Sequence, residues 1–493
     1  MPRPNLLFIF TDEQRADTLA AYGNNRIEVP NLNKLADKST VFERAYVSQP
    51  VCTPSRSTIM TGLTPHTNGC TRNNLPLDLE IPTIAEMLPD EYYNAYHGKW
   101  HLGDELFVQH GFDEWISIED GYNRHFRPDR DTSTRSDYHK WLIGHGFRPR
   151  EGETFGRGEA TRLPEEYGKP SYLAEQSIRF LRERANDARP FALYINYLEP
   201  HMPFFGPRDD QHPLDEVTIP PNFDNIPDKT RPLRERLNYA HHFANGFGEY
   251  PLRTEADWRR LIANYWGLCS LVDTHTGRIL DVLDETGLAE NTIIVYTSDH
   301  GDMMGSHRML TKSIMLEEAQ RVPLLIHLPG QTEQRRISTP VGQIDLVPTL
   351  LELMDVDTPK HVEGASLADA ARTGDDSNIT RDVFVEWTPG NSNQSVAETP
   401  EKVIPDWKLA VASEDELRRR PAEHIRGIVT RDKWKFNWST VGDHELYNLD
   451  EDPFETKNLA VEAEYGSKMR ELAERIRRWQ VQTADSVDLP ALG

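Results

Sequence analysis

The 493-residue chain has few cysteines, and its basic residues are outnumbered by acidic ones. Cys52, Cys70 and Cys269 are an odd and sparse set, which argues against a disulfide framework in a chain of this length. The 79 acidic residues exceed the 55 basic ones, giving a formal net charge of −24. Because binding a phosphate backbone requires a concentrated cationic face, we expect no nucleic-acid partner.

Long hydrophobic runs are also missing. No segment approaches the length that spans a bilayer, so we expect no membrane partner. The opening MPRPNLLFIFTDEQ contains an apolar run too short for the core of a signal peptide, and it predicts a buried strand instead. The sequence as given predicts a cytoplasmic protein, or a periplasmic or secreted one if a leader has been removed. It indicates no oligomeric state.

Continuous apolar runs alternate with helical patterns along most of the chain. Runs at 5–10, 190–201, 291–302 and 321–330 are typical of parallel strands that are covered on both faces. Stretches such as 171–186 and 271–287 have helical periodicity. This alternation predicts an α/β fold with a mainly parallel sheet flanked by helices.

The pattern changes near residue 375. The segments RDVFVEW, IRGIVTRDKWKFNW and HELYNLDEDPFETKNLA indicate antiparallel strands and turns, followed by a helix from about 463 to 483. We therefore predict an N-terminal domain, 1–375, and a smaller C-terminal α+β subdomain with an antiparallel sheet, 376–493. The segment from about 104 to 170 has weak periodicity, and it predicts long polar loops over a site.

Three polar residues directly follow predicted strands. Asp12 comes after the first strand, and Asp299 and His300 follow the strand near 295. A single Asp in such a place is more often a turn residue or a helix cap than a ligand. Open α/β sheets bind ligands at the carboxyl ends of their strands, and two carboxylates with an imidazole favour a hard divalent cation there. We expect calcium, with magnesium or manganese as alternatives.

Cys52 lies in the constrained stretch QPVCTPSRSTIMTG, two residues before Pro54 and four before Arg56. A lone cysteine is ordinarily a buried structural thiol. If the segment turns into a helix, Arg56 could lower the pKa of the thiol. Nothing nearby matches the local signatures of cysteine proteases.

The stretch from Cys52 to Arg56, with the STIMTG that follows, resembles the C-x-P-S-R signature of type I sulfatases, whose cysteine is oxidised to formylglycine. Four further segments resemble blocks of that family in the same order: GKWHLG at 98–103, EPHMPF at 199–204, and the segments 298–326 and 445–460. The resemblance covers nearly the whole chain. It implies an alkaline-phosphatase-like fold, a sulfatase catalytic domain over 1–375, hydrolysis of sulfate monoesters, and maturation by a formylglycine-generating enzyme.

The resemblance also implies a role for individual residues. The metal ligands would be Asp12, Asp299, His300 and an oxygen of the modified Cys52. Glu13 stands where relatives often have a second Asp, and it is a further candidate ligand. His300 replaces the Asn of many relatives. Besides Cys52, the implied catalytic residues are Arg56, Lys99, His101, His201 and Lys312.

Their implied tasks differ. Arg56 would hold the hydrated aldehyde. Lys99 and His101 would bind a sulfate oxygen and the second hydroxyl, with His101 as the candidate base, while His201 and Lys312 would face the bridging oxygen. Outside segments that resemble the family, a lysine is usually a solvated surface residue, and a histidine such as His201 is usually an ordinary loop residue.

Three residues beyond the nucleophile block are candidates for the substrate pocket: His66, Arg72 and Asn73. We expect Cys70 and Cys269 to be structural. The long polar segment 104–170 favours a carbohydrate sulfate as substrate over an aryl or alkyl sulfate.

Two alternatives remain open. The first is a phosphate, phosphodiester or phosphonate ester hydrolase on the same scaffold, against which the Lys-x-His pair of GKWHLG argues. The second is a non-catalytic sulfatase-like binding protein, against which the intact set of implied catalytic residues argues.

Overall fold

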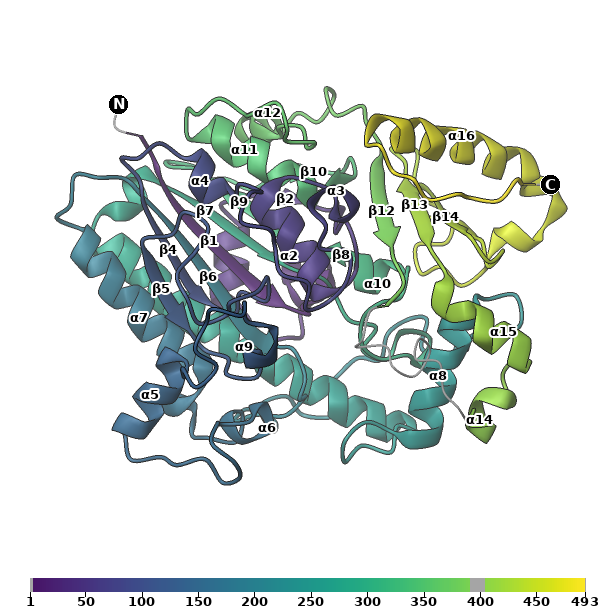
Figure 1. Ribbon diagram of the computed structural model, residues 1–493, viewed down its shortest axis with the longest axis horizontal. Coiled ribbons are helices and arrows are strands. Elements are labelled where there is room, and N and C mark those ends of the chain that lie inside the picture. The colour runs from purple at the N-terminus through teal and green to yellow at the C-terminus, as the bar shows by residue number, and fades with distance from the viewer. Residues whose placement is uncertain (1–2, 391–403, 493) are drawn as a thin grey trace.

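The computed structural model describes residues 3–390 and 404–492 (Figure 1). Its main sheet has eight strands, and only β9 runs against the others. The prediction of a mainly parallel sheet is therefore confirmed. In spatial order the strands are β10 (Arg335–Ile337), β2 (Thr40–Phe42), β9 (Leu324–His327), β7 (Thr292–Ser298), β1 (Asn5–Asp12), β6 (Phe191–Pro200), β4 (Tyr93–Gly98) and β5 (Glu114–Ser117).

Strand β1 lies at the centre of the sheet and is buried along its whole length. Successive side chains of a strand point to opposite faces. Leu6, Phe8 and Phe10 accordingly belong to one hydrophobic core, and Leu7 and Ile9 belong to another. Two apolar faces require two covering layers, which is why this strand has a continuous apolar run.

Helices supply both layers (Figure 1). The core that contains Phe8 is covered by α2 (Cys52–Thr61), α4 (Ile84–Met87), α11 (Leu346–Leu353) and α12 (Ala368–Thr373). The core that contains Ile9 is covered by α1 (Pro30–Ala36), α5 (Asp137–Gly144), α7 (Lys169–Arg184) and α9 (Glu255–Glu285). None of the helices in the described ranges combines the length and the apolarity that crossing a bilayer requires.

A second sheet lies beside this unit, at the right of Figure 1. It is a fully antiparallel meander of β12 (Val383–Trp387), β13 (Ile425–Val429), β14 (Trp434–Ser439) and β15 (Glu445–Asn448). Leu472 and Ile476 of α16 (Gly466–Gln482) pack on Ile428, Phe436 and Leu446 of this sheet. The predicted antiparallel sheet and C-terminal helix are thus confirmed, and the predicted boundary at 375 falls between α12 and β12.

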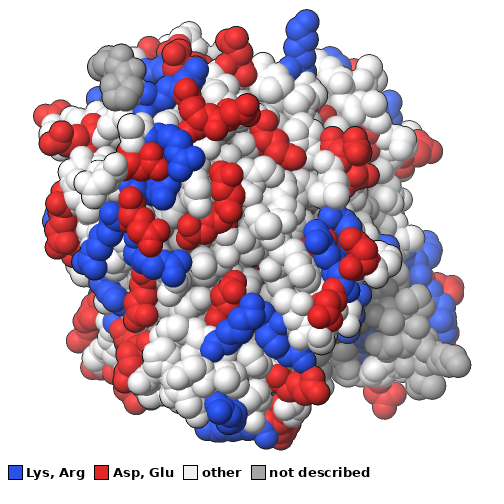
Figure 2. Space-filling view, turned by 60° about the vertical axis from the view of Figure 1, so that its left-hand side comes forward, with Lys and Arg blue, Asp and Glu red and all other residues white. Residues whose placement is uncertain are grey.

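A small sheet of β11 (Val341–Gly342), β3 (Ala45–Tyr46) and β8 (Arg321–Val322) also belongs to the fold. The remaining described α-helices are α3 (Pro65–Asn68), α6 (Arg157–Ala160), α8 (Leu233–Asn245), α10 (Glu317–Gln320), α14 (Asp406–Leu409) and α15 (Glu414–Arg419). The segment 104–170 is more ordered than predicted, because it contains β5 and α5, and Tyr138 and Leu142 of α5 are core residues. On the face shown in Figure 2, acidic and basic side chains are interspersed.

Candidate active site

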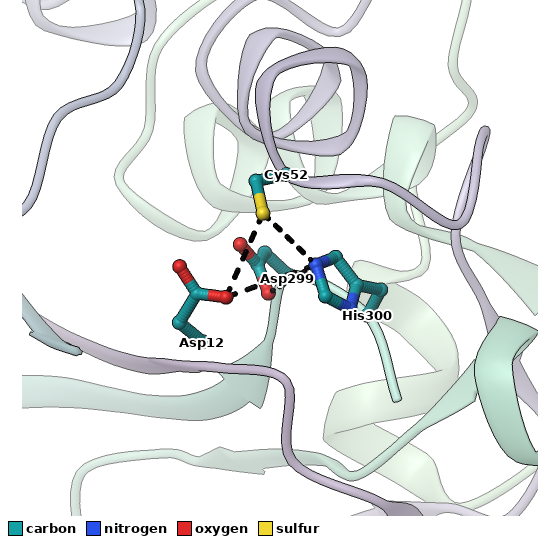
Figure 3. A group of neighbouring side chains, drawn as sticks. All are labelled: Asp12, Cys52, Asp299 and His300. Atoms are coloured by element: carbon teal, nitrogen blue, oxygen red, sulfur yellow. Dashed lines mark hydrogen bonds and ion pairs between the residues drawn. The ribbon is translucent and has the colours of Figure 1, made fainter. Parts of the chain in front are cut away.

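The predicted cation ligands meet at the carboxyl ends of β1 and β7. Asp12 ends β1, and Asp299 directly follows β7, its backbone N–H donating to the carbonyl of Thr11 at 3.0 Å. The two strands are neighbours in register, which brings together residues 287 positions apart. One ligand atom each from Asp12, Cys52, Asp299 and His300 lies within 4.8 Å of the others (Figure 3).

Cys52 is the first residue of α2, so its side chain lies at the helix N-terminus. Pro54 has no backbone N–H, and it fits this first turn because an N–H there would have no partner within the helix. Gly62 ends the helix at a positive φ of 66°. The Sγ atom of Cys52 lies 3.7 Å from Oδ1 of Asp12 and 3.2 Å from Nε2 of His300.

Arg56 is 1% exposed, and it pairs with both carboxylates of the site. Its Nη2 donates to Asp12 at 2.9 Å and its Nε to Asp299 at 2.8 Å, while Nη1 donates to Asn196. A buried charge needs such compensation, since an unpaired one is expensive. Arg56 lies one helical turn beyond Cys52 and fixes the carboxylates beside it.

The donor set fits a divalent cation. Burial would raise the pKa of Asp12, but the charges of Lys99, Arg56 and Lys312 hold it well below its ordinary value, so the carboxylate is ionised. Nδ1 of His300 bonds the carbonyl of Gly301 at 2.9 Å, an arrangement that orients Nε2 toward the group. Carboxylate oxygens of Asp12 and Asp299 are hard ligands. Against the effect of burial, Asp299 and Cys52 raise the pKa of His300 to about 9, so a bound cation would displace a proton from its imidazole.

Glu13 lies beside this group but points elsewhere. Its Oε2 contacts Nζ of Lys312 at 2.8 Å and Nε2 of His201 at 3.4 Å, and the residue has a φ of 72°. Its carboxyl also shares a side-chain hydrogen bond with Asp302. Glu13 thus forms a second group, with Asp12 and His201.

The loop after β4 carries Lys99 and His101. Lys99 Nζ contacts Oδ2 of Asp12, and Nε2 of His101 lies 2.9 Å from Oδ1 of Asn74. The buried carboxylate of Glu105 accepts the backbone N–H of Trp100 at 2.9 Å and of His101 at 2.6 Å, and so holds the loop. Burial, followed by the charges of Lys99 and Arg56, keeps the pKa of His101 well below its ordinary value, so its imidazole is neutral.

One cavity of about 930 Å³ unites these residues. Cys52, Lys99, His101, His201 and Lys312 all line it. Burial lowers the pKa of His201 well below its ordinary value, and the charge of Lys312 lowers it further. Burial alone would also lower the pKa of Lys312, but Cys52 and Glu13 outweigh that effect and raise it, so Lys312 stays protonated. The cavity therefore presents two permanent cations and two neutral imidazoles around Cys52.

The residues predicted for the substrate pocket lie elsewhere. His66 pairs with Glu386 at 2.7 Å and with the carbonyl of Thr483 at 3.1 Å, toward the C-terminal subdomain. Asn73 accepts the backbone N–H of Thr53 at 3.0 Å. Neither of them, nor Arg72, is among the described residues that line the cavity.

Sequence reasoning missed several residues of the cavity wall. Asn74, one position beyond Asn73, lines the cavity at a positive φ of 65°. Arg157 donates to Glu119 at 2.6 Å and to the Tyr122 hydroxyl at 2.7 Å. The only feature of the sequence that pointed to Arg157, Glu119 and Tyr122 is the polar character of the segment 104–170.

Asp12, Asp299 and His300 thus lie at the carboxyl ends of two central strands, with Cys52 beside them at the N-terminus of α2. Residues 4–356 match the family described as Sulfatase, and residues 305–415 match the one described as N-sulphoglucosamine sulphohydrolase, C-terminal. The chain therefore belongs to the sulfatase family, and it is a sulfate ester hydrolase.

Several known proteins are similar to the chain. The N-acetylglucosamine-6-O-sulfatase of Bacteroides thetaiotaomicron is 26% identical, with 98% of this chain and 87% of that protein covered. The arylsulfatase of Clostridium perfringens is 28% identical, over 95% and 92%.

Two solved structures share the fold. The phosphonate monoester hydrolase of Silicibacter pomeroyi aligns with a TM-score of 0.79 at 21% identity, over 98% of this chain and 96% of that one. A protein in complex with its substrate D-glucosamine-2-N,6-O-disulfate aligns with a TM-score of 0.74 at 22% identity, over 98% and 99%.

Proposed function

We propose that the protein hydrolyses carbohydrate sulfate esters with a formylglycine formed from Cys52 by a maturase, assisted by one divalent cation, preferably calcium. The observation that carries this proposal is the convergence of Cys52, Lys99, His101, His201 and Lys312 on one cavity. At its base lies the Asp12–Cys52–Asp299–His300 group. A bound cation would be held by these residues and would withdraw charge from the sulfate oxygens.

The chemistry of a hydrated aldehyde explains why residue 52 would be modified. Two hydroxyls then stand on one carbon. One attacks sulfur while the bond between sulfur and the bridging oxygen breaks. The proton of the attacking hydroxyl would pass through the Glu13–Lys312 pair to the bridging oxygen, so that the sugar leaves as an alcohol. His101, whose imidazole is neutral, would take the proton of the other hydroxyl. The electron pair then expels sulfate by C–O cleavage and restores the aldehyde, which water hydrates again.

The cations have separate tasks in this scheme. Lys99 would bind a sulfate oxygen, because a sulfate ester carries its charge on oxygens that repel nucleophiles. Lys312 and His201 both contact Oε2 of Glu13 and would face the bridging oxygen. Since Lys312 is protonated, it would stabilise the negative charge that develops on the leaving group.

The preference for a carbohydrate rests on the cavity. Its volume of about 930 Å³ suits a saccharide, and its wall has both hydrogen-bonding and aromatic side chains, including Arg157, Tyr122, His241 and Phe205. The similarity to an N-acetylglucosamine-6-O-sulfatase supports the same class. A panel of sulfated mono- and oligosaccharides, assayed beside nitrophenyl sulfate, tests it. Higher kcat/KM for nitrophenyl sulfate than for every saccharide would contradict this preference.

One observation favours a second activity. The fold is also that of a phosphonate monoester hydrolase, with a TM-score of 0.79. A phosphonate monoester carries one negative charge, like a sulfate monoester, so both could enter the same cationic cavity. Kinetics on matched nitrophenyl sulfate and nitrophenyl phenylphosphonate decide between them. We expect the sulfate to have the higher kcat/KM.

A further inference from the structure

A second cavity, of about 610 Å³, lies where the edge of the main sheet meets the C-terminal sheet. We call it the junction cavity. Its basic lining residues are Arg44 before β3, Arg321 of β8, Arg336 of β10 and Lys433 in the turn between β13 and β14. Among the described residues, those that line the junction cavity and those that line the active-site cavity have no member in common.

Two of these four cations already have acidic partners, and two do not. Arg336 pairs with Glu43 at 2.6 Å, and Lys433 pairs with Asp450. Within the part of the chain that the structure describes, neither Arg44 nor Arg321 forms an ion pair. Arg44 is only 8% exposed. Its Nη2 donates to the Tyr46 hydroxyl at 3.3 Å, while its buried Nη1 has no hydrogen-bond partner.

The small sheet explains why the two arginines face the same space. Residues two apart in a strand point to the same face, so Arg44 lies on the side of Tyr46. Tyr46 is paired in register with Arg321 across β3 and β8, and paired residues also share a face. Arg44 and Arg321 therefore lie on one face of this sheet, diagonal to each other.

The glutamate that lies nearest this face is engaged by other groups. Glu317, which also lines the cavity, accepts from Tyr46 at 2.9 Å and from Lys435 at 3.2 Å. Lys435 in turn pairs with Glu455 at 2.8 Å. Glu317 is thus shared between Tyr46 and Lys435, and the buried Nη1 of Arg44 is left without a hydrogen bond. Burying an unsatisfied guanidinium N–H is costly, so this open donor calls for a ligand.

We propose that the junction cavity binds a tetrahedral oxyanion, a sulfate or phosphate group, through the guanidinium groups of Arg44 and Arg321. Guanidinium N–H groups match two oxygens of such an anion, and charge-assisted hydrogen bonds of this kind are strong. Lys433, in the turn between β13 and β14, lines the same cavity. An anion that contacts both the arginines and Lys433 would therefore connect the C-terminal sheet to the main unit.

The direct test is diffraction from crystals of the full chain soaked in selenate, whose selenium scatters anomalously. We expect one peak at Arg44 and Arg321, separate from any peak in the active-site cavity. In Arg321→Gln the junction peak should disappear while an active-site peak persists. Arg372→Gln is the matched control, because Arg372 is an exposed partner of Glu352 and lines neither cavity. Selenate found only in the active-site cavity of the wild type would overturn the proposal.

Thermal unfolding tests the same binding in solution, and it compares free anions with a sulfated sugar. Sulfate, phosphate and glucose 6-sulfate are each compared with chloride at equal ionic strength. A ligand that binds only the folded protein raises Tm, so at least one anion should stabilise the wild type and Arg372→Gln. The increase should fall by about half or more in Arg321→Gln, because only binding in the active-site cavity remains. Equal increases in all three proteins would contradict the proposal, whichever anion is used.

Discussion

The Sγ atom of Cys52 lies 3.2 Å from Nε2 of His300 at the base of the active-site cavity. The other ring nitrogen of His300 is engaged by the carbonyl of Gly301, so the imidazole is oriented by its own neighbour. Asp12 and Asp299 complete the same group (Figure 3). The proposed nucleophile therefore belongs to the same four-residue group that would hold the cation. A change at any of these four residues should affect both.

Removal of the metal should abolish activity, and calcium or magnesium should restore it. The physical reason is that Asp12 and Asp299 bring two carboxylates together in a buried site, where a cation compensates them. The measurement is the rate of sulfate release after exhaustive chelation and after titration of each ion. Asp299→Asn should need far more calcium for the same rate. Full activity after metal removal would contradict the assignment of these ligands.

Lys312→Ala should lower turnover on the order of 100-fold for poor leaving groups and much less for nitrophenolate. Lys312 is protonated and held by Glu13, and its charge matters most when the departing oxygen is strongly basic. The measurement is kcat/KM across aryl sulfates of graded leaving-group pKa.

Lys99→Ala provides the comparison, because Lys99 contacts Asp12 on the sulfate side of the site. Its loss should be nearly constant across the series. If Lys312→Ala also gives a constant loss, Lys312 binds the sulfate group and does not act on the leaving group.

His66→Gln should change the pH dependence of stability and leave KM unchanged. Burial would lower the pKa of His66, but its hydrogen bond to Glu386 and the charge of that carboxylate outweigh burial and raise it. A raised folded-state pKa stabilises the protein fully below the unfolded value of about 6.5, and this stabilisation is lost as pH rises through the folded value. Denaturant unfolding should therefore separate the two proteins more at about pH 5.5 than at about pH 9. A raised KM in His66→Gln would instead return His66 to the substrate pocket.

Much of the site could be predicted because it depends on short-range patterns and on sheet topology. Asp12 and Asp299 were predicted to meet because both end strands, and β1 and β7 are indeed adjacent. Segments with family-like motifs predicted Lys99, His101, His201 and Lys312, which surround one cavity. Each of these residues lies directly beyond a strand or within a matched segment, so its position follows from local structure.

The remainder depends on long-range packing. His66 pairs with Glu386 only because α3 packs against the C-terminal sheet, and no local pattern carries that contact. Asn74 replaces Asn73 in the cavity wall because a positive φ turns the chain at that position, and two successive asparagines look alike in sequence. Glu105 holds the loop of His101 through backbone N–H groups, which any sequence offers.

Activity should depend on how Cys52 is processed. A thiolate could attack sulfur, but the adduct would have no second hydroxyl with which to expel sulfate, so turnover would stop after one step. We therefore expect turnover to scale with the formylglycine fraction of each preparation. Protein made without a maturase should bind substrate yet stay nearly inactive, and Cys52→Ser should behave likewise unless the maturase accepts serine. Peptide mass spectrometry of the fragment VCTPSR, run beside kinetics on the same batch, measures both quantities. Full activity from entirely unmodified Cys52 would replace this mechanism with direct attack by the cysteine.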